Sequence, residues 1–157
     1  MSYDIDLRLP EYGPIDDRAA LEELEGSPMS ETERARNRGL VTRLREQAPE
    51  LELHESGEDV ELTDLRSGIQ ISLFAKSGAV SMPYWHEGNA AELLRQISKY
   101  LRLLHDEGGF LAYDPQTERK VDAATGYSLD PAVYAVGVDA LRDALKPAER
   151  KPWWRFW

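Results

Sequence analysis

One long amphipathic segment, residues 89–109, constrains the fold of this chain more than any other. Asn89 and Glu92 form a capping-box pattern at its start, and two consecutive glycines after it can supply the left-handed stop. The pattern predicts a helix over about Ala90–Glu107. A single apolar stripe follows it at helical spacing and calls for a sheet packed against it: Leu93, Leu94, Ile97, Tyr100, Leu101 and Leu104.

Alternating residues before this helix predict strands joined by short turns. Residues 3–9 are typical of a half-buried strand, with Asp4, Asp6 and Arg8 on its solvated face. Leu51–Thr63 reads as a hairpin. Residues 69–73 and 80–84 follow as two more strands, with turns predicted at Ser67-Gly68 and Ser77-Gly78; Pro83 lies in the second and should sit at an edge, a bulge or the strand end.

Helical patterns flank these strands. A short one runs over residues 16–24, and a longer one over residues 30–47 opens with a capping box of Ser30 and Glu33. After the long helix, residues 110–114 and 120–122 read as strands. Asp130-Pro131 is a good start for a last helix, which Gly137 and several valines weaken because they are poorer helix formers.

These elements predict an α+β fold: an antiparallel meander sheet of about five or six strands, with the helices packed mainly on one face. The length, 157 residues, suits a single domain over 1–157 that ends in an aromatic tail at 150–157. We expect the N-terminal strand to join the sheet, but the pattern does not predict its neighbours.

The formal net charge of −10 and the absence of cysteine exclude several classes of function. An acidic chain lacks the basic footprint that non-specific nucleic-acid binding requires, and anionic membrane surfaces repel it. Without cysteine there is no disulfide, thiol nucleophile or zinc–thiolate site. The opening residues do not resemble a secretion signal. We therefore expect a cytoplasmic protein that binds neither nucleic acid nor membrane.

The predicted hairpin is strongly acidic, since no Lys or Arg interrupts residues 50–64. Such a face can hold a basic protein patch, or it can be an ordinary solvated sheet face whose charges block aggregation. The first reading makes the protein a non-enzymatic binding module for a basic protein. Its candidate contact residues in the hairpin are Glu52, Glu55, Glu58, Asp59 and Glu61.

The C-terminal tail KPWWRFW holds three of the four tryptophans of the chain. Trp153, Trp154 and Trp157 can anchor a partner, since Trp dominates binding hot spots, or they can support self-association. Alternatively, the tail folds back and closes the core of the molecule itself. The sequence does not predict an oligomeric state.

Enzymatic signals are weak. No nucleophile elbow, phosphate-binding loop or metal-ligand spacing occurs in the chain, so no catalytic residue, metal or cofactor is predicted. The alternative of a small enzyme or ligand-binding protein rests on a pocket near Tyr84, Trp85 and His86, the densest mixed polar and aromatic cluster.

Two short segments carry a resemblance. Met1-Ser2-Tyr3-Asp4 at the start, and Tyr113-Asp114-Pro115-Gln116 after the long helix, resemble a loose group of small uncharacterised bacterial proteins that open MSYD and carry YDPQ downstream. Some of these look like immunity proteins that neutralise a toxin by binding it. The resemblance implies a cytoplasmic, non-enzymatic binding protein whose partner is a toxin.

Overall fold

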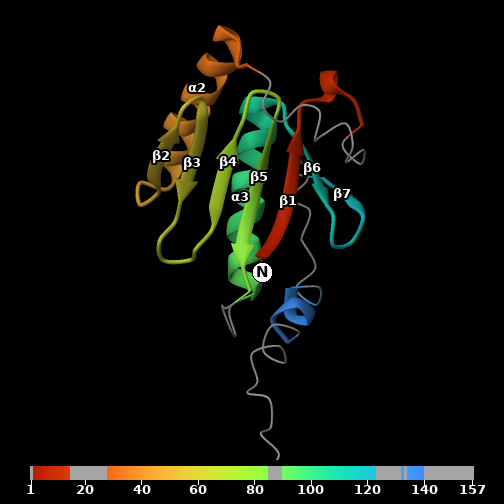
Figure 1. Ribbon diagram of the computed structural model, residues 1–157. Coiled ribbons are helices and arrows are strands. Elements are labelled where there is room, and N and C mark those ends of the chain that lie inside the picture. The colour runs from red at the N-terminus through yellow and green to blue at the C-terminus, as the bar shows by residue number, and fades with distance from the viewer. Residues whose placement is uncertain (1, 15–27, 85–89, 123–131, 133, 140–157) are drawn as a thin grey trace, which may run out of the picture.

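A seven-stranded antiparallel sheet with two long helices on one face forms most of the described part of the chain, and residues 134–139 add a short helical segment (Figure 1). The computed structural model describes residues 2–14, 28–84, 90–122, 132 and 134–139. In chain order the elements are β1 (Ser2–Arg8), the short 3-10 helix η1 (Pro10–Tyr12), α2 (Glu31–Gln47), β2 (Glu52–Ser56), β3 (Asp59–Thr63), β4 (Gln70–Leu73), β5 (Ser77–Pro83), α3 (Ala90–Gly108), β6 (Leu111–Asp114) and β7 (Arg119–Val121). The predicted α+β class is confirmed.

The strand order is β2-β3-β4-β5-β1-β6-β7, so the sheet has more strands than the five or six expected. Strands β2 to β5 form the predicted meander, each pairing with the next. β1 inserts between β5 and β6, which the local pattern did not predict. The two ends of the sheet are therefore β2 and β7.

Helix α3 supplies the centre of the core, as its apolar stripe predicts. It begins at Ala90 and ends at Gly108, and Gly109 follows with a φ of 73°. All six stripe residues are buried. In Figure 1 α3 lies behind β4, β5 and β1, where its stripe packs on the apolar side chains of those strands. The prediction that a sheet covers this helix is confirmed.

Helix α2 lies on the same face, behind β2 and β3 (Figure 1). The predicted capping box is present, since Ser30 N–H donates to Glu33 Oε2 over 2.6 Å and Glu33 N–H donates to Ser30 Oγ. Burial alone would raise the pKa of Glu33, but hydrogen bonds from Ser30 and from the Tyr12 hydroxyl hold that pKa below its usual value. Only Leu40 and Leu44 are buried apolar residues of α2, which keeps it at the edge of the core.

The other face of the sheet is not covered by α2 or α3 (Figure 1), and the alternation of β1 places Asp4, Asp6 and Arg8 there. The expectation that all three are solvated is wrong for Arg8, which is fully buried. The reason is tertiary: the chain after β1 folds back, and Arg8 Nη1 donates to the carbonyl of Pro14.

Two local predictions at β5 have different outcomes. Pro83 ends the strand, as expected for a residue without an N–H to donate. The turn predicted at Ser77-Gly78 falls earlier, because β5 already begins at Ser77. Gly78 lies inside the strand, where an added Cβ would come within 2.6 Å of the Ser72 carbonyl oxygen. Here the glycine permits close packing and makes no turn.

Candidate protein-binding surface

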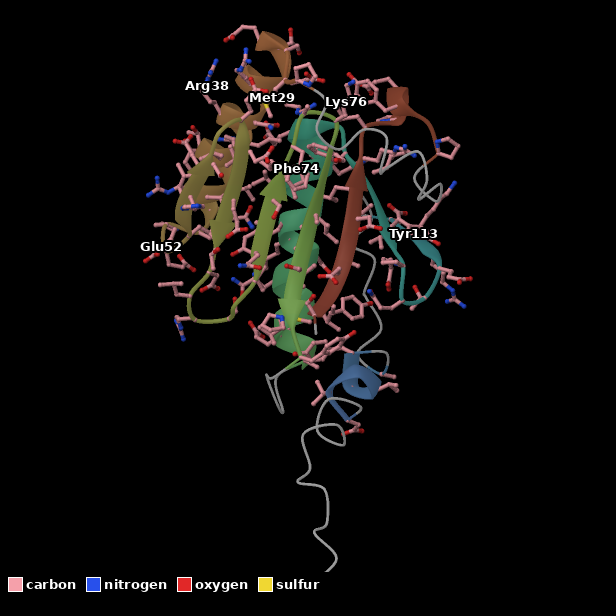
Figure 2. The ribbon with its side chains drawn as sticks, in the orientation of Figure 1. Met29, Arg38, Glu52, Phe74, Lys76 and Tyr113 are labelled. Carbon is pink, nitrogen blue, oxygen red and sulfur yellow. The ribbon has the colours of Figure 1, made fainter. Side chains whose placement is uncertain are left out.

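The acidic hairpin is the free end of the sheet. β2 pairs with β3 alone, and all five of its residues are exposed. The two-residue turn is Gly57-Glu58, with Gly57 at a φ of 66°, the conformation that a tight type II′ hairpin turn requires at its first position. Figure 2 shows Glu52 at this outer edge, across the open face from Tyr113 on β6.

The register divides the predicted acidic residues between two faces, because residues directly opposite each other share a face. Glu52 lies in one row of the open face with Thr63, Gln70, Ser81 and Asp4. The next row of that face runs His54, Glu61, Ser72, Ala79 and Asp6. The open face thus carries carboxylates over β2–β3 and again over β1, with small neutral side chains between them.

Asp59 belongs to the same open face as Glu61, two residues along β3. Glu55 belongs to the opposite face, since it pairs with Val60, which packs against the core. Sequence reasoning missed both this division and the contribution of Asp4 and Asp6. The alternation of β1 did place Asp4 and Asp6 together on one side of their strand. Only the strand order shows that this side belongs to the same face of the sheet as Glu52 and Glu61.

Glu58, at the turn, holds the hairpin to the start of α2. Its carboxylate accepts from the Met29 N–H over 2.8 Å and from Arg34 Nη2. The hydrogen bond from Arg34, and then that from Met29, lower the pKa of Glu58 below its usual value. Glu58 is therefore held by residues at the start of α2, whereas Glu61 accepts only from the Thr63 hydroxyl among the hydrogen bonds found in the described part of the chain.

A groove lies between α2 and the hairpin, with a volume of about 390 Å³. Its apolar lining comes from Met29, Val41, Leu53 and Val60. Arg34 and Arg38 line the helix side, where Glu58 and Glu31 pair with them; the Arg38–Glu31 distance is 3.0 Å. Figure 2 shows Met29 and Arg38 near the top of the hairpin and Glu52 lower, at its outer edge. The floor of the groove is therefore apolar, and the two arginines on its helix side already form ion pairs with Glu58 and Glu31.

The alternative site near Tyr84 is described only in part, because Trp85 and His86 lie outside the described residues. Tyr84 itself is buried, stacked on Tyr134 with ring centroids 5.4 Å apart and edge-on to Tyr3 at 6.4 Å. Burial raises the pKa of the Tyr84 hydroxyl, and the nearby carboxylates add to the effect. Tyr84 is thus a packed residue of the core.

Other predicted features fall outside the described residues as well. They are the tryptophans Trp153, Trp154 and Trp157, the helical pattern over 16–24, and the cap residue Asn89. In the part of the chain that is described, no group of three His, Asp or Glu side chains has the arrangement that could hold a metal ion. Within the same part, neither α2 nor α3 has the length and apolar character of a membrane span.

Comparison with known proteins adds no relative. No family model matches the chain, and neither the curated proteins nor the solved structures contain a significant match.

Proposed function

We propose that this protein is a non-enzymatic binding module that takes a basic protein on its acidic hairpin. One observation carries the proposal. Among the described residues, the carboxylates of Glu52, Glu55, Asp59 and Glu61 form no ion pair with a Lys or Arg, although seven ion pairs form elsewhere in that part of the chain. Four negative charges at one end of the sheet, three of them exposed and that of Glu61 half-buried, are thus left for a partner to neutralise.

The physical effect of such a surface is on association. A patch of one sign steers an oppositely charged protein to it and raises the rate of encounter, and salt screens that attraction over about 10 Å. The acidic row over β1 extends the same sign across the open face. A basic partner therefore meets its strongest favourable potential at the hairpin, and Asp4 and Asp6 extend the same sign to part of β1.

The resemblance of the MSYD and YDPQ segments extends this proposal to a toxin as the partner. An immunity-type protein must bind its toxin tightly and fast, and an acidic recognition surface serves both needs when the toxin is basic. This extension rests on those two segments and on no structural contact.

The test compares two variants of equal charge. The first changes Glu52, Glu55 and Glu61 to Gln and Asp59 to Asn. The control makes the same four neutralisations on the helices, at Glu46, Glu92, Asp106 and Glu107, whose carboxylates already pair with Arg. Both variants change the net charge by the same amount, so a general effect of charge is removed from the comparison.

The partner is first captured from source-cell lysate by the full chain at about 50 mM salt and identified by mass spectrometry. Calorimetry with the purified partner should give an affinity at least about tenfold weaker for the hairpin variant and nearly unchanged for the helix variant. Equal weakening in both variants, or none in either, would end the proposal.

A further inference from the structure

The outer edge of β2 offers backbone groups that no described residue pairs with. In an antiparallel ladder, opposed residues alternate between hydrogen-bonded and non-hydrogen-bonded pairs. The two-residue turn closes on the pair Ser56–Asp59, so the pairs at His54 and Glu52 are also hydrogen-bonded, and Leu53 and Glu55 point their N–H and C=O groups away from β3. Four backbone groups on this edge therefore face outward, in the spacing that another strand would match.

The edge strand β2 is protected by charge alone. Natural sheets blunt their edges with charged side chains, Pro, bulges or very short strands. β2 contains no Pro and no Lys, pairs with β3 without a bulge, and is five residues long, against three for β7 at the other end. Its only protection is negative charge, from Glu52 and Glu55. That charge repels a second copy of the same edge but attracts a basic strand.

The apolar layer between the sheet and α2 is incomplete at β2, as Leu53 shows. Its side chain lies on the helix face with that of Leu62, its partner across the ladder. Leu62 is fully buried, whereas Leu53 is 38% exposed and lines the groove together with Val41 of α2. A further strand beside β2 would place a side chain over Leu53 and Val41, and so complete the layer that β3 already has.

We propose that the partner supplies an extended segment of alternating basic and apolar residues, which adds to β2 as an eighth strand. Its backbone pairs with Leu53 and Glu55, and its apolar side chains lie on the helix face over Leu53 and Val41. Its basic side chains lie on the open face, one opposite Glu52 and one in the row of His54 and Glu61. This inference rests on the proposed function, because it takes the basic partner from it and adds how that partner is held.

Three labelled peptides test the strand addition on the full chain by fluorescence anisotropy. Four Lys-Val repeats carry the proposed pattern, four Glu-Val repeats reverse the charge, and four Lys-Pro repeats keep the charge but remove every second N–H. We expect binding of the Lys-Val peptide, at least about tenfold weaker binding of the Lys-Pro peptide, and none of the Glu-Val peptide. Equal affinity for the two basic peptides would overturn strand addition while leaving the charge-based function intact.

Hydrogen exchange locates the added strand. The amides of Leu53 and Glu55 should become protected when the Lys-Val peptide binds, while those of His54 and Ser56, which face β3, should change little. The variant Leu53→Lys should weaken binding about tenfold, whereas Leu65→Lys, at an exposed leucine in the β3–β4 turn, should not. Protection elsewhere, or equal effects of the two variants, would overturn the inference.

A second copy of the chain is the competing occupant of this edge. Light scattering of the peptide-free protein over a range of concentrations distinguishes it. A constant monomer mass leaves the edge free for the partner. A dimer in which Leu53 and Glu55 amides are already protected would assign the edge to self-association and overturn the proposal.

Discussion

Asp64, directly after β3, holds the β3–β4 turn through its carboxylate. It accepts from the Ser67 hydroxyl over 2.6 Å, from the Arg66 N–H over 2.9 Å and from Gln96 Nε2 of α3 over 3.2 Å. Burial alone would raise the pKa of Asp64, but these hydrogen bonds lower it below the ordinary 3.8. The ionised side chain thus ties the meander to the central helix.

The variant Asp64→Asn should lower the free energy of unfolding at pH 7 by about 1 to 3 kcal/mol, since a charged acceptor is lost from a buried turn. Because the folded-state pKa lies below the unfolded one, the contribution of Asp64 is fully present above about pH 5 and is lost as the pH falls below 3.8. Urea titrations at several pH values should therefore show the gap between wild type and variant closing in acid. Asp59→Asn, at an exposed carboxylate, is the control and should leave the free energy of unfolding at pH 7 nearly unchanged.

A buried hydrogen bond joins Tyr3, in the MSYD segment, to Asp114, in the YDPQ segment. The Tyr3 hydroxyl donates to Asp114 Oδ2 over 2.5 Å, and both groups are buried. Asp114 Oδ1 also accepts from the N–H groups of Gln116 and Thr117, which sets the β6–β7 turn. The two segments therefore meet inside the fold, and their side chains serve its stability.

The helical segment over residues 134–139 depends on a glycine that sequence reasoning counted against it. A Cβ on Gly137 would lie 2.1 Å from Tyr84 Cε1, so this helix packs on the tyrosine cluster only without a side chain there. Gly137→Ala should therefore destabilise the protein by about 1 to 3 kcal/mol, although alanine is the better helix former.

Gly39 is the matched control, because it lies in α2 and a Cβ there meets nothing within 4 Å. Gly39→Ala should raise the free energy of unfolding by about 0.5 to 1 kcal/mol. Thermal or urea unfolding of the two variants measures both. Stabilisation by Gly137→Ala would show that Tyr84 is not packed against this helix.

Elements whose signal is local were predictable. α3 was predicted to within a residue at each end, with its complete buried stripe, because cap, periodicity and stop all lie in one segment. The hairpin was predictable for the same reason. The position of β1 was not, since its pairing with β5 and β6 depends on residues far along the chain. The burial of Arg8 was not predicted either, because it depends on the chain after β1, which folds back so that Arg8 donates to the carbonyl of Pro14.

For the candidate site, the sequence predicted which acidic residues belong to the hairpin but not how they are placed in the fold. The acidic residues of the hairpin were treated as one face, and their pattern did not predict which face α2 would cover. That assignment placed Glu55 beside the groove and left Glu61 on the open side. The use of Glu58 to hold α2 required a contact between residues 24 positions apart, Arg34 and Glu58, which no local pattern contains.

In the whole molecule, the sheet combines the meander β2–β5, whose strands follow one another in sequence, with β1, which lies far in sequence from its partner β5. Val80 of β5 pairs with Ile71 of β4 on one side and with Ile5 of β1 on the other, and all three side chains are fully buried. Val80 follows Ile71 by 9 residues and Ile5 by 75. Closing the longer loop costs about 2 kcal/mol more in chain entropy, so β1 should join a meander that has already formed.

Ile5→Ala and Ile71→Ala form a matched pair for this order of events, because each removes the same side chain from the same row of the core. Each should lower the free energy of unfolding by about 2 to 5 kcal/mol. Stopped-flow urea kinetics should show that Ile71→Ala mainly slows folding, whereas Ile5→Ala mainly speeds unfolding, since contacts absent from the transition state affect the unfolding rate. If Ile5→Ala slowed folding as much as Ile71→Ala, the central strand would already be in place at the transition state, and the sheet would fold around β1 instead of receiving it last.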